Sequence, residues 1–156
     1  MAQRNKKMGQ PKDAIAMLKA DHQRVRDLFQ QYEATSNAEA KRTIAEEVFI
    51  ELETHAQLEE NIFYPAVNEE TDEGAELVKE SLAEHETMKN IIQQLRNMGP
   101  HNGGFDARFR ELLQNVEHHV EEEETEMFPL AEEELEEDMK DLWDEMQELK
   151  AQILAS

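Results

Sequence analysis

The sequence predicts an all-α protein: an antiparallel up-down-up-down four-helix bundle with an additional C-terminal helix. Three observations support this prediction: a helix-forming composition, repeated apolar seams, and short breaks between them. Glu, Ala, Gln, Leu, Lys and Met are plentiful, whereas the 156 residues include only five Gly and four Pro. Short connections between long amphipathic helices make each helix antiparallel to the next.

Four segments carry residues spaced alternately three and four apart, which places them on one face of a helix. In chain order the seams are Ile15, Leu18, His22, Val25, Phe29 and Tyr32; Val48, Leu52, His55, Glu59, Ile62 and Ala66; Val78, Ser81, His85, Met88, Ile92 and Leu95; and Phe109, Leu112, Val116, His119, Glu123 and Met127. The breaks between them are expected at Thr35–Ala38, Glu70–Gly74 and Met98–Asp106. The last break contains Gly-Pro and Gly-Gly, which are strong turn signals.

A fifth periodic stretch follows Pro129. Its apolar residues are Leu135, Met139, Leu142, Met146, Leu149 and Ile153. We expect a C-terminal amphipathic helix over 131–156 that packs across the bundle or pairs with a second copy of the chain as a coiled coil, giving a homodimer. Residues 13–130 would then form the bundle, and residues 1–12 a basic, flexible N-terminus.

The charge of the chain restricts its partners. Acidic residues outnumber basic ones 37 to 16, giving a net charge of −21. Such a surface repels phosphate, so neither nucleic acid nor an anionic membrane is expected as a partner. The absence of cysteine excludes disulfides and thiolate ligands. With no signal peptide at the N-terminus and no apolar run of membrane-spanning length, we expect a cytoplasmic protein.

Each seam contains a histidine, and the second and fourth seams also contain a glutamate four residues later. Such a glutamate lies one turn further along the same helix face. Buried imidazoles and carboxylates are costly unless something satisfies them, and a pair of metal ions would do so. Counting residues from the helix breaks places these side chains at nearly one level of the bundle. The candidate metal ligands are His22, His55, Glu59, His85, His119 and Glu123.

The sequence also resembles itself. The segment from His55 to Glu59 and the segment from His119 to Glu123 are each followed by an aromatic-proline pair, with the proline ten residues after the histidine. This alignment selects His119 and Glu123 over His118 and Glu122, which have the same spacing. We therefore expect His118 on the surface or behind the ligands.

Several neighbouring residues are expected to have structural roles. Tyr64 and Phe128, beside the prolines, are expected to pack in the core rather than act as redox relays. Pro65 and Pro129 are expected to kink or end their helices. His101 lies in a Gly-rich loop and is expected to be solvent-exposed.

These motifs resemble those of hemerythrin-like proteins of the HHE cation-binding type. The resemblance runs from about Asp13 to Leu130 through Asp21-His22, the two His-x-x-x-Glu motifs and Glu84-His85-Glu86. It implies a di-iron centre, oxo- or hydroxo-bridged, with zinc or manganese as alternatives. The implied terminal iron ligands are His22, His55, His85 and His119, and the implied bridging ligands are Glu59 and Glu123.

One feature departs from the oxygen carriers of this family, which have two histidines four residues apart in the third helix. Here Ser81 and Lys89 stand four residues before and after His85, so one nitrogen ligand is missing. That leaves room for water, an exogenous ligand or a substituting carboxylate, and Glu86 and Glu60 remain open as further ligands. Reversible oxygen storage is therefore not assumed.

The resemblance implies a protein that binds or senses oxygen, nitric oxide, peroxide or iron itself. An oxidoreductase that reduces peroxide or oxygen, or oxidises nitric oxide, is the alternative, and an iron donor for damaged iron centres is a third interpretation. A single structural zinc ion competes with all three. Ferritin-like di-iron bundles use Glu-x-x-His, and no glutamate here precedes a histidine by three residues.

Overall fold

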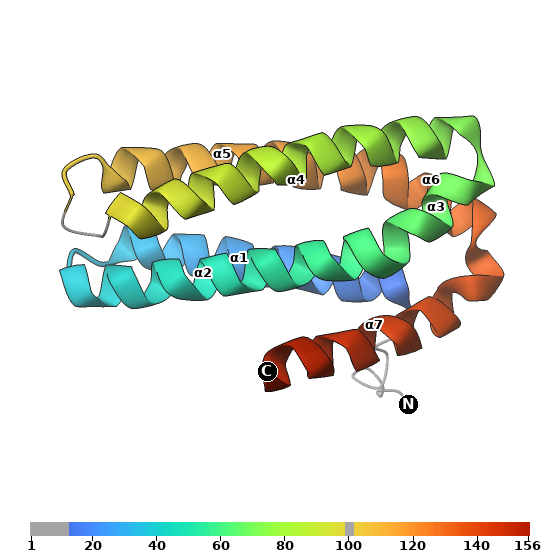
Figure 1. The fold of residues 1–156 in the computed structure, drawn as a ribbon, viewed down its shortest axis with the longest axis horizontal. Helices are drawn as coiled ribbons and strands as arrows, with labels where there is room; N and C mark the ends of the chain where they lie inside the picture. The colour runs from blue at the N-terminus through green and yellow to red at the C-terminus, as the bar shows by residue number, and fades with distance from the viewer. Residues whose placement is uncertain (1–12, 99–101) are drawn as a thin grey trace, which may run out of the picture.

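The computed structural model describes residues 13–98 and 102–156 and confirms the all-α bundle. Its four long helices are α1 (Ala14–Ala34), α2 (Ala38–Leu58), α4 (Asp72–Met98) and α5 (Phe105–Glu122). Short segments prolong two of them: η2 (Glu59–Phe63) and α3 (Tyr64–Glu70) follow α2, and η3 (Glu123–Met127) and α6 (Phe128–Glu134) follow α5. Figure 1 shows these two extended helices and their partners α1 and α4 lying antiparallel in one bundle.

The helices begin and end where the sequence places the breaks. The Asp13 carboxylate accepts a hydrogen bond from the Ile15 backbone N–H at 2.7 Å and caps α1. The Asn37 side chain accepts one from the Ala40 N–H at 2.9 Å and caps α2. The breaks after Ala34, Glu70 and Met98 agree with prediction, while His101 and residues 1–12 lie outside the described residues.

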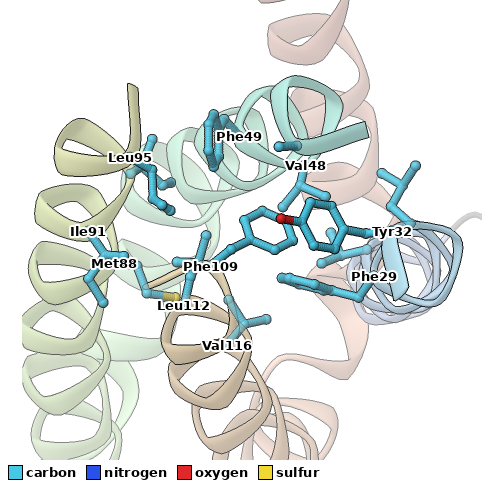
Figure 2. Close-up of a cluster of buried hydrophobic side chains, with 14 of the residues drawn as sticks. Phe29, Tyr32, Val48, Phe49, Met88, Ile91, Leu95, Phe109, Leu112 and Val116 are labelled. Atoms are coloured by element: carbon cyan, nitrogen blue, oxygen red, sulfur yellow. The ribbon is translucent and has the colours of Figure 1, made fainter. Parts of the chain in front are cut away.

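Two apolar clusters fill the bundle, one on each side of a polar layer. The first contains Val25, Phe29, Tyr32, Val48, Phe49, Met88, Leu95, Phe109, Leu112 and Val116 among others, and Figure 2 shows its rings gathered around Phe109. The second contains Ile15, Leu18, Leu58, Phe63, Val67, Val78, Met127, Phe128 and Met146 among others. On α1, Leu18 belongs to the second cluster and Val25 to the first, so His22 falls between them.

The C-terminal helix begins later than expected. The fourth bundle helix continues as α6 to Glu134, and Leu135 leaves helical geometry with φ −121° and ψ 23°. A short turn, η4 (Glu136–Asp138), leads into α7 (Met139–Ala155), which runs outside the bundle along α1 and α2 (Figure 1). Its buried residues Met139, Leu142 and Met146 join the second apolar cluster. The helix thus packs across the bundle, while pairing with a second copy stays a prediction.

No helix within the described part of the chain is both long and apolar enough to cross a membrane.

Candidate metal centre

All six predicted ligands converge in one buried layer between the two apolar clusters. Each of these residues is at most 7 % exposed. The histidines come from the four long helices, and the glutamates stand at the first residue of η2 and of η3. The donors form two overlapping groups whose ligand atoms lie within 4.8 Å of one another. These groups are His22, His55, Glu59 and Glu123, and His85, His119, Glu59 and Glu123.

Glu59 spans the two histidine pairs. Its Oε2 lies 3.0 Å from Nε2 of His55, in the first pair. Its Oε1 lies 3.0 Å from Nε2 of His85, in the second pair. One carboxylate therefore presents an oxygen to each pair, which is the geometry that a bridge between two ions requires.

Glu123 repeats this arrangement from the other extended helix. Its Oε1 lies 3.2 Å from Nε2 of His22, and its Oε2 lies 3.3 Å from Nε2 of His119. The two carboxylates thus occupy equivalent positions, as the internal sequence repeat predicts. Together they offer each histidine pair two oxygens.

Each histidine is also held from behind, because its Nδ1 faces a carboxylate on another helix. The four contacts are His22 with Glu124 at 2.8 Å, His55 with Asp21 at 3.0 Å, His85 with Glu60 at 2.7 Å and His119 with Glu84 at 2.7 Å. A carboxylate can only accept, so Nδ1 carries a proton and Nε2 points inward, where its lone pair would bind a metal ion once that nitrogen is free of a proton.

Sequence reasoning missed these outer carboxylates, although a signal for them was present. Each is the immediate neighbour of a predicted ligand: Asp21-His22, Glu59-Glu60, Glu84-His85 and Glu123-Glu124. The two residues that were left open as further ligands behave differently from each other. Glu60 holds His85 from behind, whereas Glu86 is 71 % exposed and lies beside Lys89.

Tyr64 differs from expectation, because its hydroxyl lies inside the centre. The hydroxyl oxygen is 2.9 Å from Oε1 of Glu59, 3.3 Å from Nε2 of His85 and 3.4 Å from Nε2 of His119. It also makes a hydrogen bond to Oε2 of Glu123. A buried phenol that contacts four donor groups is more than a packing residue.

The π turns η2 and η3 explain why Tyr64 was missed. The Tyr64 backbone N–H bonds to the Glu59 carbonyl five residues earlier, so this turn contains one residue more than an α turn. The seam therefore shifts by one position after Glu59. Ile62, predicted on the seam, is only half-buried, whereas Phe63 is fully buried.

The two histidine pairs have different surroundings. Phe128 is the counterpart of Tyr64 in the repeat, and its ring stacks on His22 with centroids 5.8 Å apart. The first pair consequently has no hydroxyl from this position. In the described residues, four buried atoms there lack a hydrogen-bond partner: His22 Nε2, His55 Nε2, Glu59 Oε2 and Glu123 Oε1. These atoms are imidazole nitrogens and carboxylate oxygens that face one another at the first pair. Buried ligand atoms without hydrogen-bond partners fit a bound metal ion.

The electrostatics also fit a cation. Burial lowers the pKa of His55, but the charge of Glu59 and the hydrogen bond to Asp21 raise it overall to about 10. Burial also lowers the pKa of His119, but the charge of Glu123 and hydrogen bonds to carboxylates raise it overall, well above its usual value. Burial, Glu59 and Glu123 raise the pKa of Tyr64. Without a metal ion, protons therefore compensate the two buried carboxylates.

A pocket of about 40 Å³ reaches all four histidines from the side of the first apolar cluster. Its apolar lining includes Val25, Leu52, Met88, Ile92 and Val116. The volume exceeds the roughly 10–15 Å³ that one water molecule needs. The pocket therefore has room for a small molecule beside the donors.

His118 lies outside this layer. Its side chain is 66 % exposed, and its Nε2 lies 3.2 Å from Glu122 and 3.5 Å from Glu84. Glu122 also makes a hydrogen bond with Glu84. This bond and the negative charge of Glu84 raise the pKa of Glu122 to about 7. His118 therefore sits on the surface behind the Glu84 carboxylate that holds His119.

Comparison with known proteins gives one family match. The family described as Hemerythrin HHE cation binding domain matches residues 13–131. A solved structure of a hemerythrin HHE cation binding domain-containing protein from Mycobacterium kansasii superposes with a TM-score of 0.78 at 24 % identity, covering 90 % of this chain and 86 % of that one. At this identity the likeness shows the fold.

Two curated relatives are similar in sequence. One is named DNA nickase, from Nostoc sp. (strain PCC 7120 / SAG 25.82 / UTEX 2576), and is 26 % identical over 81 % of this chain and 36 % of its own length. The other is an uncharacterized hemerythrin-like protein of Schizosaccharomyces pombe, 25 % identical over 85 % of this chain and 64 % of its own length. The chain thus spans less than two thirds of the length of either relative.

Proposed function

The chain belongs to the hemerythrin HHE cation-binding domain family, and on that premise we propose that it is a non-haem di-iron protein that binds or senses a small ligand. The ligand would be oxygen, nitric oxide or peroxide, or the protein would sense iron itself. The buried cluster of histidines and glutamates is compatible with a metal site. Nitrogen and oxygen donors without sulfur suit iron, and zinc and manganese are the alternatives.

The observation that carries the proposal is the division of each carboxylate between two histidine pairs. Glu59 and Glu123 each direct one oxygen to each pair, at 3.0–3.3 Å from the nearest Nε2 atoms. A single tetrahedral zinc ion would use only one pair and leave the other unsatisfied. Two ions use all six side chains. His22 and His55 would hold one ion, and His85 and His119 the other.

Tyr64 would complete the second position. Its hydroxyl lies near Nε2 of both His85 and His119, and the third helix lacks the second histidine that the resemblance to oxygen carriers leads one to expect there. Among the residues that the structure describes, the first position has only His22 and His55 beside the two carboxylates. The resulting asymmetry leaves room for an exogenous ligand at the first ion.

When bound, the two iron ions would supply ligand coordination and redox chemistry. The protein's own part is to orient the donors and to limit the access of water. The outer carboxylates fix the imidazoles, and the apolar pocket admits only small molecules.

A second candidate is an oxidoreductase that uses the same centre. The Tyr64 hydroxyl favours it, because a phenol in contact with Glu59 and Glu123 can hold a proton beside the reacting ligand. The surface charge argues against DNA as a substrate. The relative named DNA nickase is matched over only 36 % of its length, so its name does not oppose this. A net charge of −21 repels a phosphate backbone.

Metal analysis tests the centre itself. Protein purified from iron-replete cells is expected to contain two irons per chain, and His55→Ala and Glu59→Ala are each expected to lose metal. One zinc per chain in the wild type, or unchanged iron in both variants, contradicts the di-iron assignment.

Ligand reactivity then separates the two candidates. We expect the reduced, iron-loaded protein to form a stable and reversible visible band when it meets oxygen or nitric oxide. Rapid loss of added peroxide over many turnovers would instead favour the oxidoreductase. Zinc-loaded protein serves as the redox-silent control.

A further inference from the structure

We propose that α7 is a working part of the metal centre, in which Lys150 positions the Asp21 carboxylate that orients His55. This inference rests on the proposed metal centre and extends it to a segment beyond the family match. That match ends at residue 131, whereas α7 begins at Met139. Lys150 touches no donor directly, so it is a positioning residue rather than a ligand.

Lys150 and His55 contact different oxygens of the same carboxylate, that of Asp21. Asp21 is buried, and its Oδ2 lies 3.0 Å from Nδ1 of His55. Its Oδ1 lies 3.5 Å from Nζ of Lys150. The carboxylate is therefore held from both sides, and its orientation depends on the ammonium as well as on the imidazole.

The fold fixes Lys150 at this place. Met146, one turn earlier on the same face of α7, is fully buried in the second apolar cluster. This anchor directs Lys150 toward α1, with which α7 is in contact. The lysine is partly buried, so its ammonium group lies close to a carboxylate that has little access to water.

The charge distribution supports a specific role. Only 16 Lys and Arg residues balance 37 acidic ones, yet one of them is placed on the carboxylate behind a ligand. The Asp21 carboxylate thus faces the Lys150 ammonium with one oxygen and His55 Nδ1 with the other.

Positioning and simple electrostatics predict opposite effects of removing the lysine. A positive charge near a metal ion repels it, so Coulomb forces alone predict that Lys150→Met slows metal release. If Lys150 positions Asp21, the same change loosens His55 and accelerates release. The sign of the change therefore decides between the two.

The experiment loads full-length protein with Fe²⁺ without oxygen and follows iron transfer to a strong ferrous chelator. Lys150→Met is expected to accelerate release about threefold to tenfold, less than the roughly tenfold to hundredfold typical of the partner carboxylate itself. Lys150→Arg is expected to restore the wild-type rate. Lys140→Met is the matched control, since it removes the same charge from α7 and its partner Asp144 lies within that helix.

The coupling also has a reciprocal readout. Metal loading is expected to slow hydrogen exchange of the α7 amides in the wild type and to do so much less in Lys150→Met. Release from Lys150→Met that is equal to or slower than release from Lys140→Met overturns the positioning role. If wild-type protein fails to take up two irons, the proposed di-iron function fails first, and the two failures are thereby distinguished.

Discussion

Metal binding is expected to release protons, because the metal-free centre holds them on His55 and His119. The pKa of His55 is about 10, above its ordinary value of 6.5. The proton therefore stabilises the metal-free fold, fully below pH 6.5 and progressively less as the pH rises through about 10. A metal ion needs the lone pair of Nε2, so it must displace this proton.

The size of the effect follows from that pKa. At pH 7, His55 lies three pH units below its pKa of about 10. Each unit costs about 1.4 kcal/mol, so deprotonation opposes metal binding by roughly 4 kcal/mol. Apparent affinity should then rise about tenfold per pH unit for each proton released. His119, whose pKa is also raised, makes the slope steeper than for one proton.

Asp21→Asn is the variant that tests the source of the effect. The amide removes the negative charge that helps to raise the pKa of His55, so fewer protons should be released near pH 8 and the pH slope should flatten. Titration calorimetry with Zn²⁺ in two buffers of different ionisation enthalpy counts the protons, and His118→Ala is the exposed control. Metal binding without proton release, or identical slopes for wild type and Asp21→Asn, would refute the reasoning.

Three further predictions concern single side chains. Tyr64→Phe should retain metal but lose the phenolate-to-iron visible absorption of the ferric protein, and unchanged absorption would mean that Tyr64 is no ligand. His119→Ala should lower metal content measured by atomic absorption, whereas His118→Ala should not, because only His119 faces the donors. Phe109→Ala should cost about 3–5 kcal/mol in urea unfolding, compared with no more than about 0.5 kcal/mol for Leu154→Ala, whose side chain is 58 % exposed. A similar loss for both variants would contradict the packing in Figure 2.

The helices and the six donors were predictable because a single period governs them. Residues three and four apart share a helix face, and from Ile15 to Tyr32 this spacing matches the buried stripe of α1. Histidines at equal distances from the helix breaks then meet at one depth. The seams could therefore be counted into one layer before any contact was known.

The same period fails after Glu59, where Phe63 rather than Ile62 is fully buried, whereas Met127 after Glu123 is buried as predicted. A π turn adds one residue, so the sequence places Tyr64 in the core, where it lies, but does not show that its hydroxyl reaches the centre. Leu135 gave a comparable error, because the sequence pattern continues through the turn that separates α6 from α7. Periodicity finds a helix face but does not detect a change in its pitch.

The outer carboxylates show how neighbouring residues divide two tasks. Consecutive side chains on a helix point in different directions, so one of each pair can face the centre while the other faces an adjacent helix. Around the bundle, Asp21 of α1 holds the histidine of α2, Glu60 after α2 holds that of α4, Glu84 of α4 holds that of α5, and Glu124 after α5 holds that of α1. Every long helix thus supplies a ligand and receives support from its neighbour.

This closed ring has an energetic consequence. Separating any one helix from the bundle would free its own histidine and also remove the carboxylate that orients a histidine elsewhere, so two ligands are lost together. Metal affinity should therefore depend on the whole bundle rather than on pairs of helices. Lys150 extends the ring outward through Asp21, which ties the docking of α7 to the same set of contacts. Metal binding and the packing of the helices are therefore expected to be cooperative.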